Sequence, residues 1–358
     1  MKRGVLLMTF GSPATLDDVP AYLASVRGGR PAPEEVVQEF RRRYALIGGS
    51  PLLRITRAQA AALEARLNDT ADDGAVYRVA AGMRHSAPLI EDALAQLVAC
   101  GARRIAAIIM SPQYSPIIMG AYHRALDAAR KAVAPDVDVR VAGAWHRHPG
   151  FLDALAQRVR EALDRLPAGV RDTVPVILTA HSLPRSVVDK EPHYLDQIQD
   201  TVEAVVQRVG LAPDRWQFAY QSAGHTPEEW LKPDFKDLLP GLAAQGHRHV
   251  LFVPTQFLAD HLEILYDIDV AAREQAEANG IAFHRIESLN LLPTFIDALA
   301  SVARQTIGNQ LHCHPEQTTE HAHARAQGVS VQNEASGGVR TPTATTARRR
   351  PRSLASSG

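Results

Sequence analysis

The segment Val176-Ile-Leu-Thr-Ala-His-Ser-Leu-Pro184 decides the fold. Its first five residues form an apolar run of the length of a buried strand, and Ser182 and Pro184 end that run abruptly. The segment Val5-Leu-Leu-Met-Thr-Phe-Gly-Ser-Pro13 has the same plan near the start of the chain. This strand-and-turn unit occurs twice, which predicts two copies of one structural unit. Phe10 and His181 then occupy equivalent strand ends.

Other apolar runs extend this pattern along the chain. They are short enough for strands and alternate with longer amphipathic stretches that are typical of helices. Continuous apolar strands separated by helices indicate parallel sheets that are covered on both faces. We therefore predict an α/β protein with two similar doubly wound parallel-sheet domains that face each other across a central cleft. The predicted strands are 5–10, 79–83, 105–110, 139–143, 176–180, 217–220 and 250–253, and the predicted helices include 55–67, 88–99 and 149–166.

Changes in composition along the chain set the domain limits. A segment rich in Pro, Gly and Arg interrupts the first unit over residues 16–54, and we interpret it as an insertion that forms part of the cleft. The first domain then covers residues 1–148 and the second covers residues 149–308. Beyond residue 308 the sequence has no hydrophobic period and few large apolar residues to offset the entropy of ordering. Residues 309–358 are therefore predicted to be a disordered tail.

Charge and cysteine content exclude several classes of protein. Lys and Arg together number 39, as do Asp and Glu, so no net field attracts nucleic acid. Cys100 and Cys313 cannot build a disulfide framework, and two thiolates are too few for an iron–sulfur cluster. No apolar run approaches the length of about 20 residues that crosses a bilayer. The sequence thus predicts a cytoplasmic protein with no nucleic-acid partner, no membrane span and no iron–sulfur cluster.

His181 is a candidate metal ligand or proton acceptor. A histidine after a strand is more often a packed or surface residue than a functional one. Here the tight exit through Ser182 and Pro184 makes the imidazole project from the sheet edge, and open α/β sheets bind ligands at that edge. A neutral imidazole is also the commonest nitrogen ligand of divalent transition metals.

Glu263 and Asp267 stand four residues apart, and they therefore share one face of a predicted helix. Asp260, three residues before Glu263, is placed on the same face. Acidic residues on a helix usually form only a solvated face. The neighbours here are mostly apolar, which predicts a largely buried helix. A buried carboxylate is costly unless it is paired or bound to a metal.

The insertion concentrates arginines, among them Arg27 and Arg43, and a glycine pair follows them. Such a loop is often a plain solvent-exposed connection. The alternative is a lid that grips carboxylates, because guanidinium pairs with a carboxylate through two hydrogen bonds. Tyr122 follows the predicted strand 105–110, again near a carboxyl end, although core packing is the simpler interpretation.

Longer sequence strings add a family resemblance. They are Ile47-Gly-Gly-Ser-Pro-Leu52, Gly82-Met-Arg-His85, Ala180-His-Ser-Leu-Pro184, Gln221-Ser-Ala-Gly-His-Thr-Pro-Glu-Glu-Trp-Leu-Lys-Pro233 and the segment 257–269. These strings resemble the ferrochelatase family, whose members insert ferrous iron into a porphyrin. The resemblance covers about residues 3–307 and is nearest to the monofunctional bacterial enzymes that metallate coproporphyrin III. It implies two similar doubly wound domains, in agreement with the internal repeat.

The resemblance also implies roles for individual residues. His181 and Glu263 match the iron-binding, catalytic pair of the family, with Asp267 and His85 in support. The positions that match porphyrin contacts are Phe10, Arg27, Arg43, Ser50 and Tyr122.

Two residues depart from the pattern of the coproporphyrin relatives. Phe10 stands where they have a tyrosine able to ligate product iron, and Ala271 stands where they have a further carboxylate. Because of these two departures, the resemblance does not establish how product iron is ligated or whether an auxiliary metal site is present.

The resemblance implies a ferrochelatase of haem biosynthesis that inserts Fe²⁺ into coproporphyrin III. Fe²⁺ is then a substrate, and we expect no permanently bound cofactor. Protoporphyrin IX as the substrate, or a cobalt chelatase of similar architecture, are the alternatives within enzymes. A haem carrier that uses His181 as an axial ligand is the alternative from another class, but it has no use for Glu263 and Asp267. We expect a monomer. Any contacts with neighbouring haem-pathway enzymes are expected to be transient.

Overall fold

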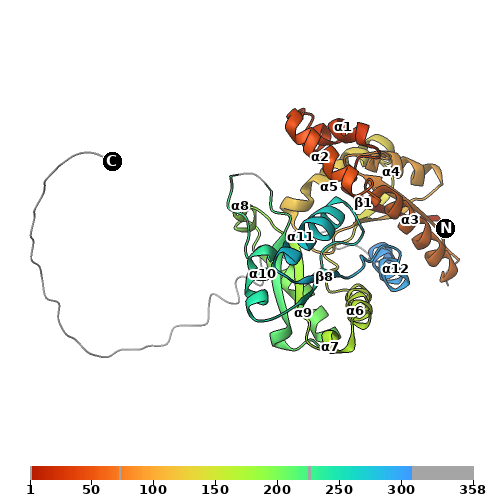
Figure 1. Ribbon diagram of the computed structural model, residues 1–358. Coiled ribbons are helices and arrows are strands. Elements are labelled where there is room, and N and C mark those ends of the chain that lie inside the picture. Colours follow the sequence, from red (N-terminus) through yellow and green to blue (C-terminus); the bar gives the residue numbers. More distant parts are fainter. Residues whose placement is uncertain (1, 72–73, 225–226, 309–358) are drawn as a thin grey trace, which may run out of the picture. The chain divides into compact units, whose positions relative to one another are not determined.

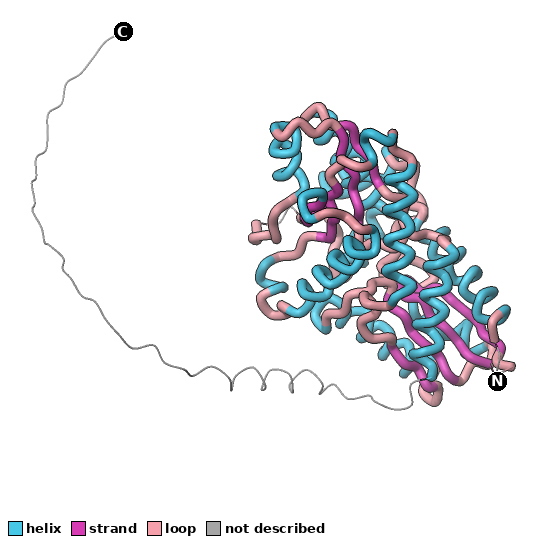
Figure 2. Tube along the Cα trace, turned by 90° about the horizontal axis from the view of Figure 1, so that it is seen from below, coloured by secondary structure: helices cyan, strands magenta, loops and turns pink. Residues whose placement is uncertain are grey.

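Two four-stranded sheets, each with its strands parallel, organise the chain, and Figure 2 shows them as separate groups of strands. The computed structural model describes residues 2–71, 74–224 and 227–308. The first sheet has the strand order β2-β1-β3-β4, and the second has the order β6-β5-β7-β8. The same order in both sheets confirms the predicted fold class and the internal repeat.

The strands lie where the apolar runs predict them, with one addition. The strand β8 was not predicted, because its four residues bury only Phe283 and end in a histidine and an arginine. So short an edge strand has too little apolar alternation to stand out in the sequence. The bounds are β1 (Lys2–Thr9), β2 (Val76–Met83), β3 (Arg104–Ile109), β4 (Asp138–Val141), β5 (Val176–His181), β6 (Trp216–Gln221), β7 (His249–Pro254) and β8 (Ala282–Arg285).

Helices cover the faces of both sheets (Figure 1). The three predicted helices are confirmed as α3 (Leu52–Asp69), α4 (Ile90–Ala99) and α6 (Pro149–Asp164). The other helices outside the insertion are α5 (Pro116–Val133), α7 (Ala168–Arg171), α8 (Arg185–Val188), α9 (His193–Val209), η2 (Pro213–Arg215), α10 (Phe235–Ala244), η3 (Glu263–Ala272), α11 (Arg273–Ala278) and α12 (Pro293–Gly308).

The insertion is largely helical, which corrects its interpretation as an arginine-rich loop. It forms η1 (Leu16–Asp18), α1 (Val19–Val26) and α2 (Glu34–Leu46) before α3 begins. Val37 and Tyr44 of α2 are buried against α1. Leu262, which comes from the second half of the chain, packs on the same small cluster. The insertion is therefore a structured cover that contacts the second half of the protein.

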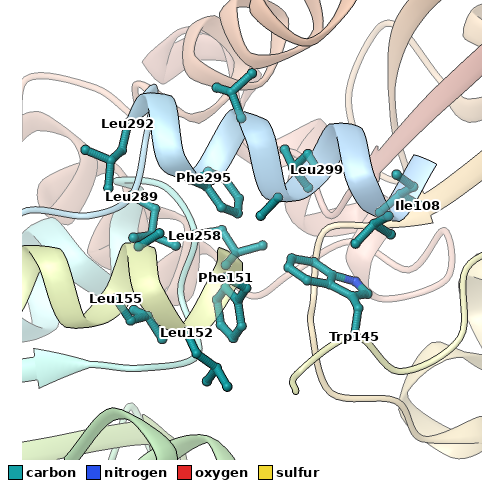
Figure 3. Packing of buried hydrophobic residues seen from close by; sticks show 14 of the residues in the cluster. Ile108, Trp145, Phe151, Leu152, Leu155, Leu258, Leu289, Leu292, Phe295 and Leu299 are labelled. Atoms are coloured by element: carbon teal, nitrogen blue, oxygen red, sulfur yellow. The ribbon is translucent and has the colours of Figure 1, made fainter. Parts of the chain in front are cut away.

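The main hydrophobic core joins the two sheets through α12 and α6 (Figures 1 and 3). Phe295 and Leu299 of α12 pack with Phe151 of α6 and with Ile108 of β3, and all four are fully buried. The last helix of the second half thus shares a core with the first sheet.

The domain limits at residues 148 and 149 stay a prediction. The predicted tail, residues 309–358, lies outside the described residues.

The carboxyl ends of β1, β2 and β5 carry several of the candidate site residues. Phe10 follows β1, Arg84 and His85 follow β2, and His181 is the last residue of β5. Met8 of β1 lies beside Gly82 of β2, so Phe10 and Arg84 leave neighbouring strands. Among the described helices, none is both long and apolar enough to cross a membrane.

Candidate active site

The imidazole of His181 is held in one orientation. Its Nδ1 contacts the backbone carbonyl of Ser182, and a carbonyl oxygen only accepts hydrogen bonds. The Nδ1–H group is therefore the donor, which assigns the neutral ring its lone pair at Nε2. The backbone N–H of His181 donates to Oε1 of Gln256 (3.0 Å), which fixes the end of β5 next to the segment after β7.

The lone pair of His181 faces a carboxylate. His181 Nε2 and Glu263 Oε2 lie 3.5 Å apart. The Glu263 side chain is 36% exposed as a whole, but Oε2 is buried and has no hydrogen-bond partner within the part of the chain that the structure describes. Two acceptors in this arrangement attract a cation, either a proton or a metal ion. Metal–ligand bonds of about 2.1 Å span the 3.5 Å gap at an angle of about 110°.

His261 adds a third acceptor that the sequence analysis did not single out. Its Nδ1 lies 2.9 Å from the carbonyl oxygen of Ala259, so Nδ1–H donates and Nε2 carries the lone pair. That Nε2 lies 4.0 Å from Glu263 Oε2. Across residues 2–71, 74–224 and 227–308, no three such side chains converge closely enough to form a complete metal site. The three side chains therefore do not form a closed metal site. In the sequence, His261 could have been noticed only from its position two residues before Glu263.

The acidic helix η3 is a π-helix, Glu263–Ala272, and not the α-helix expected from the sequence. Its wider turn still places Glu263 and Asp267 next to each other, and π-turns are frequent at functional sites. Burial raises the pKa of Asp267, and the charge of Glu263 raises it further, whereas the Ser222 hydroxyl, Arg43 and His181 oppose this rise. Ser222 Oγ donates to Asp267 Oδ2 at 2.5 Å.

Two expectations about this helix were wrong. The helix is only half-buried, because its fully buried residues are confined to Ile264, Ile268 and Ala272. Asp260 precedes the helix and is held elsewhere, since its carboxylate accepts from Ser288 Oγ (2.7 Å) and Asn290 Nδ2 (2.8 Å). Asp260 therefore has a structural role outside the acidic face.

The opposite wall of the site comes from the first sheet. The Arg84 guanidinium lies over the rings of Phe10 (5.5 Å) and Tyr122 (5.1 Å). The His85 ring packs on Phe10 with centroids 4.6 Å apart, and His85 Nδ1 lies 2.9 Å from Ser25 Oγ. Arg84 thus joins Phe10 and Tyr122, and His85 packs on Phe10. Arg84 was missed, although it directly precedes His85.

A cavity of about 130 Å³ connects the two walls. The first half contributes Phe10 and Tyr122, and the second half contributes Gln256, Phe257 and His261. The cleft expected between the two sheets is therefore present, and apolar rings line much of it.

The insertion contacts the second half of the chain through Tyr266 of η3. Arg42 Nη2 donates to the Tyr266 hydroxyl (2.5 Å), and the guanidinium groups of Arg42 and Arg43 lie 5.5 and 4.9 Å from the Tyr266 ring centre. Arg43 also pairs with Glu39 at 2.7 Å. Arg43 is therefore next to the acidic helix, as its effect on Asp267 also indicates.

Arg27 and Ser50 belong to the insertion, on other elements than His181 and Glu263. Arg27 is exposed at the end of α1. Ser50 Oγ accepts from the backbone N–H of Leu52 (3.3 Å) and lines a separate cavity of about 340 Å³ beside Tyr44 and Thr15. Their assignment as porphyrin contacts stays a prediction.

His85 should titrate far below an ordinary histidine. Burial, followed by the charge of Arg84, lowers the pKa of His85 from 6.5 to about 4. The unfolded chain takes up this proton near pH 6.5, so the His85 contribution to stability is lost as the pH falls from 6.5 towards 4. We expect an NMR titration of the His85 ring to have its midpoint near pH 4, and a midpoint near 6.5 would contradict the described packing.

An imidazole faces a carboxylate near the carboxyl end of β5 in this α/β protein, an arrangement suited to handling protons and metal ions. Solved structures share this fold. The structure titled SirB from Bacillus subtilis with Fe3+ matches with a TM-score of 0.53 and 12% sequence identity, covering 86% of this chain and 97% of that chain. Such low identity shows the fold alone.

Sequence comparison gives the family. The ferrochelatase family model matches residues 2–307. A protein named ferrochelatase from Deinococcus radiodurans is 40% identical over 300 residues, which cover 84% of this chain and 94% of the relative. A coproporphyrin III ferrochelatase from Geobacillus kaustophilus is 37% identical over 302 residues, 84% of this chain and 94% of the relative. The chain belongs to the ferrochelatase family, the lyases that insert iron into a porphyrin.

Proposed function

We propose that this protein inserts Fe²⁺ into coproporphyrin III, with His181 and Glu263 as the reacting pair. The single observation that carries the proposal is the facing pair of acceptors, His181 Nε2 and Glu263 Oε2, which lie 3.5 Å apart. The reaction must remove two pyrrole protons and strip water from hydrated Fe²⁺. The imidazole lone pair can accept a pyrrole proton, and the carboxylate oxygen, which has no hydrogen-bond partner among the described residues, can bind Fe²⁺.

His181 acts as the proton acceptor in this proposal. Its Nδ1–H is engaged by the Ser182 carbonyl, so Nε2 is the atom that receives a pyrrole proton. The imidazolium that forms is stabilised by the Glu263 carboxylate beside it. This contact favours proton transfer, because the charge that develops on His181 has a partner already in place.

Glu263 and Asp267 guide iron and carry protons outward. Glu263 lies against His181, and Asp267 lies beside Glu263 on η3. The raised pKa of Asp267 makes this carboxyl easier to protonate than an ordinary aspartate. A proton passed from the Glu263 region therefore has an acceptor on the same face of the helix.

The cleft must open before a porphyrin can enter. Its cavity is about 130 Å³, whereas pockets that enclose small ligands usually measure about 300–1,000 Å³. The contact of Arg42 and Arg43 with Tyr266 closes α2 onto η3. A porphyrin carboxylate competes for these guanidinium groups with the Tyr266 ring and with Glu39, which pairs with Arg42 at 2.8 Å and with Arg43 at 2.7 Å. Substrate binding and opening of the cleft are thus coupled in the proposal.

Coproporphyrin III is favoured by this charge pattern. It carries four propionates, whereas protoporphyrin IX carries two. Arg84 lies over Phe10 and Tyr122, which line the cavity, and Arg42 and Arg43 lie over Tyr266 of the acidic helix. Several relatives at 34–37% identity carry the name coproporphyrin III ferrochelatase. Two relatives at 39–40% identity are named only ferrochelatase, so protoporphyrin IX is the alternative that the test must address.

Phe10 distinguishes this chain from the tyrosine pattern of the coproporphyrin relatives. The ring is 40% exposed and lies between Arg84 and His85. It has no oxygen with which to ligate product iron. In the proposal, Phe10 therefore serves as an apolar contact for the macrocycle and not as a metal ligand.

Direct competition tests the substrate assignment. With both porphyrins in one anaerobic assay, kcat/KM for Fe²⁺ insertion should be higher for coproporphyrin III. Each exposed guanidinium–carboxylate pair contributes up to about 1 kcal/mol, and more when desolvated. The preference should shrink in Arg43→Ala and at high salt.

A matched control removes an arginine far from the cleft. Arg171 of α7 pairs with Asp164 (3.2 Å), and Arg171→Ala should keep the full preference. A clear advantage for protoporphyrin IX would reject the substrate assignment and leave iron insertion in place.

A haem carrier is the rival from another class. It needs an axial histidine but gains nothing from the acceptor pair of His181 and Glu263. Steady-state metallation by the purified protein under anaerobic Fe²⁺ separates the two, since a carrier shows no turnover. We include in the proposal that the protein is a cytoplasmic monomer and needs no permanently bound cofactor.

A further inference from the structure

Two histidines face each other at the far edge of the second sheet. His249 begins β7 and His284 lies on the neighbouring edge strand β8. His249 Nδ1 and His284 Nε2 are 3.1 Å apart, and the rings are nearly parallel, with 5.3 Å between their centres. Both side chains are half-buried. The opposite end of β7 leads to Gln256 in the cleft, so the length of a strand separates this pair from the active site.

The backbone holds the pair in register. Leu251 of β7 pairs with His284, and His249 pairs with Ala282, so the two rings are diagonal neighbours on one face of the sheet. Adjacent strands fix side chains more firmly than a loop does. The pairing of the two strands therefore already holds the two nitrogens close together, and no ligand is needed to fold this part of the chain.

The distance between the nitrogens suits a chelated metal ion once each ring turns so that its lone pair points at the ion and not at the other nitrogen. In the empty state one ring N–H donates to the other nitrogen. When both nitrogens present lone pairs, metal–nitrogen bonds of 2.0–2.1 Å span 3.1 Å at an angle of about 100°. This value lies between the 90° of square-planar or octahedral geometry and the angle of about 109° in a tetrahedron.

We propose that His249 and His284 form a second transition-metal site, which chelates one divalent late transition metal ion such as Cu²⁺ and completes its coordination with water. Neutral imidazole suits Cu²⁺, Ni²⁺ and Zn²⁺, and the affinity order of divalent ions places Cu²⁺ well above Fe²⁺. The site thus binds competitor metals in preference to the iron substrate. Arg273, whose guanidinium lies 4.5 Å from the Phe283 ring next to His284, brings positive charge nearby and limits the affinity.

A bound ion would link the edge strand β8 to β7. Binding that requires the native pairing of the strands stabilises the folded state by mass action. Cu²⁺ should therefore raise the melting temperature of the full-length protein through this pair, in addition to any effect at other histidines.

Isothermal titration of the full-length protein with Cu²⁺ tests the site. His249→Gln and His284→Gln should each bind one equivalent fewer than wild type, and the double variant should lose the same single equivalent. His193→Gln is the matched control, since this side chain is 81% exposed on α9 and belongs to neither strand. Histidines elsewhere bind equally in all these proteins and cancel in the difference. Equal stoichiometry in wild type and the double variant would overturn the proposal.

The wild-type protein provides a second readout that does not depend on a variant folding. Added Zn²⁺, which is diamagnetic, should shift the ring NMR signals of His249 and His284 together and saturate both at one concentration. Signals that stay unchanged, or that saturate separately, would contradict a shared ion. Neither measurement uses iron insertion, so the outcome is independent of the proposed function.

Discussion

His181→Ala should lower the rate of iron insertion by about 100- to 10,000-fold, the range in which a positioned proton acceptor contributes. The variant removes the Nε2 lone pair that faces Glu263 across 3.5 Å. The measurement is single-turnover insertion of Fe²⁺ under anaerobic conditions, which reports the chemical step without product release.

Porphyrin binding should survive in the same variant. The proposed grip on the macrocycle comes from Arg42 and Arg43 on α2 and from the wall around Phe10, and not from the imidazole. Fluorescence quenching of the metal-free porphyrin gives its Kd, which we expect to change by less than threefold. His193→Ala serves as the control for the loss of an exposed histidine. Near-normal turnover in His181→Ala would reject the central assignment, and a lost melting transition would show instead that the residue supports the fold.

Glu263→Gln should reduce the rate by two or more decades, about 3 kcal/mol at 1.36 kcal/mol per tenfold change. The amide keeps the shape of the side chain but has no charge for Fe²⁺ and almost no basicity. It also brings a donor where Oε2 was an acceptor, so its N–H group can bond to His181 Nε2 and occupy the lone pair. Both effects act on the step in which protons leave and iron enters.

The control for this variant is Glu203→Gln, an exposed carboxylate of α9 that accepts from Gln199 Nε2 at 2.9 Å. It should insert iron at the wild-type rate. The Kd for porphyrin should stay unchanged in Glu263→Gln, whereas the apparent affinity for the metal falls. Wild-type kinetics in Glu263→Gln would assign this carboxylate a structural role.

The sequence by itself determined the strands other than β8, their repeat and the placement of the central histidine. The runs that became β1 and β5 are continuous and apolar, and such runs are recognisable because a fully buried strand leaves no room for polar residues. The repeat then made Phe10 and His181 equivalent strand ends. The spacing of Glu263 and Asp267 predicted that they lie next to each other. This holds although the helix is a π-helix and not an α-helix, because residues four apart are neighbours in both.

Tertiary structure alone decided how these parts form one site. The π-helix, the closure of Arg42 and Arg43 onto Tyr266, and the joining of Phe10 to Tyr122 by Arg84 depend on contacts between segments far apart in the chain. Local patterns of hydrophobicity carry no information about such contacts, because they report which face of a segment is buried but not what buries it. The sequence therefore determines the strand ends that carry the candidate site, and packing between distant segments determines which side chains meet there.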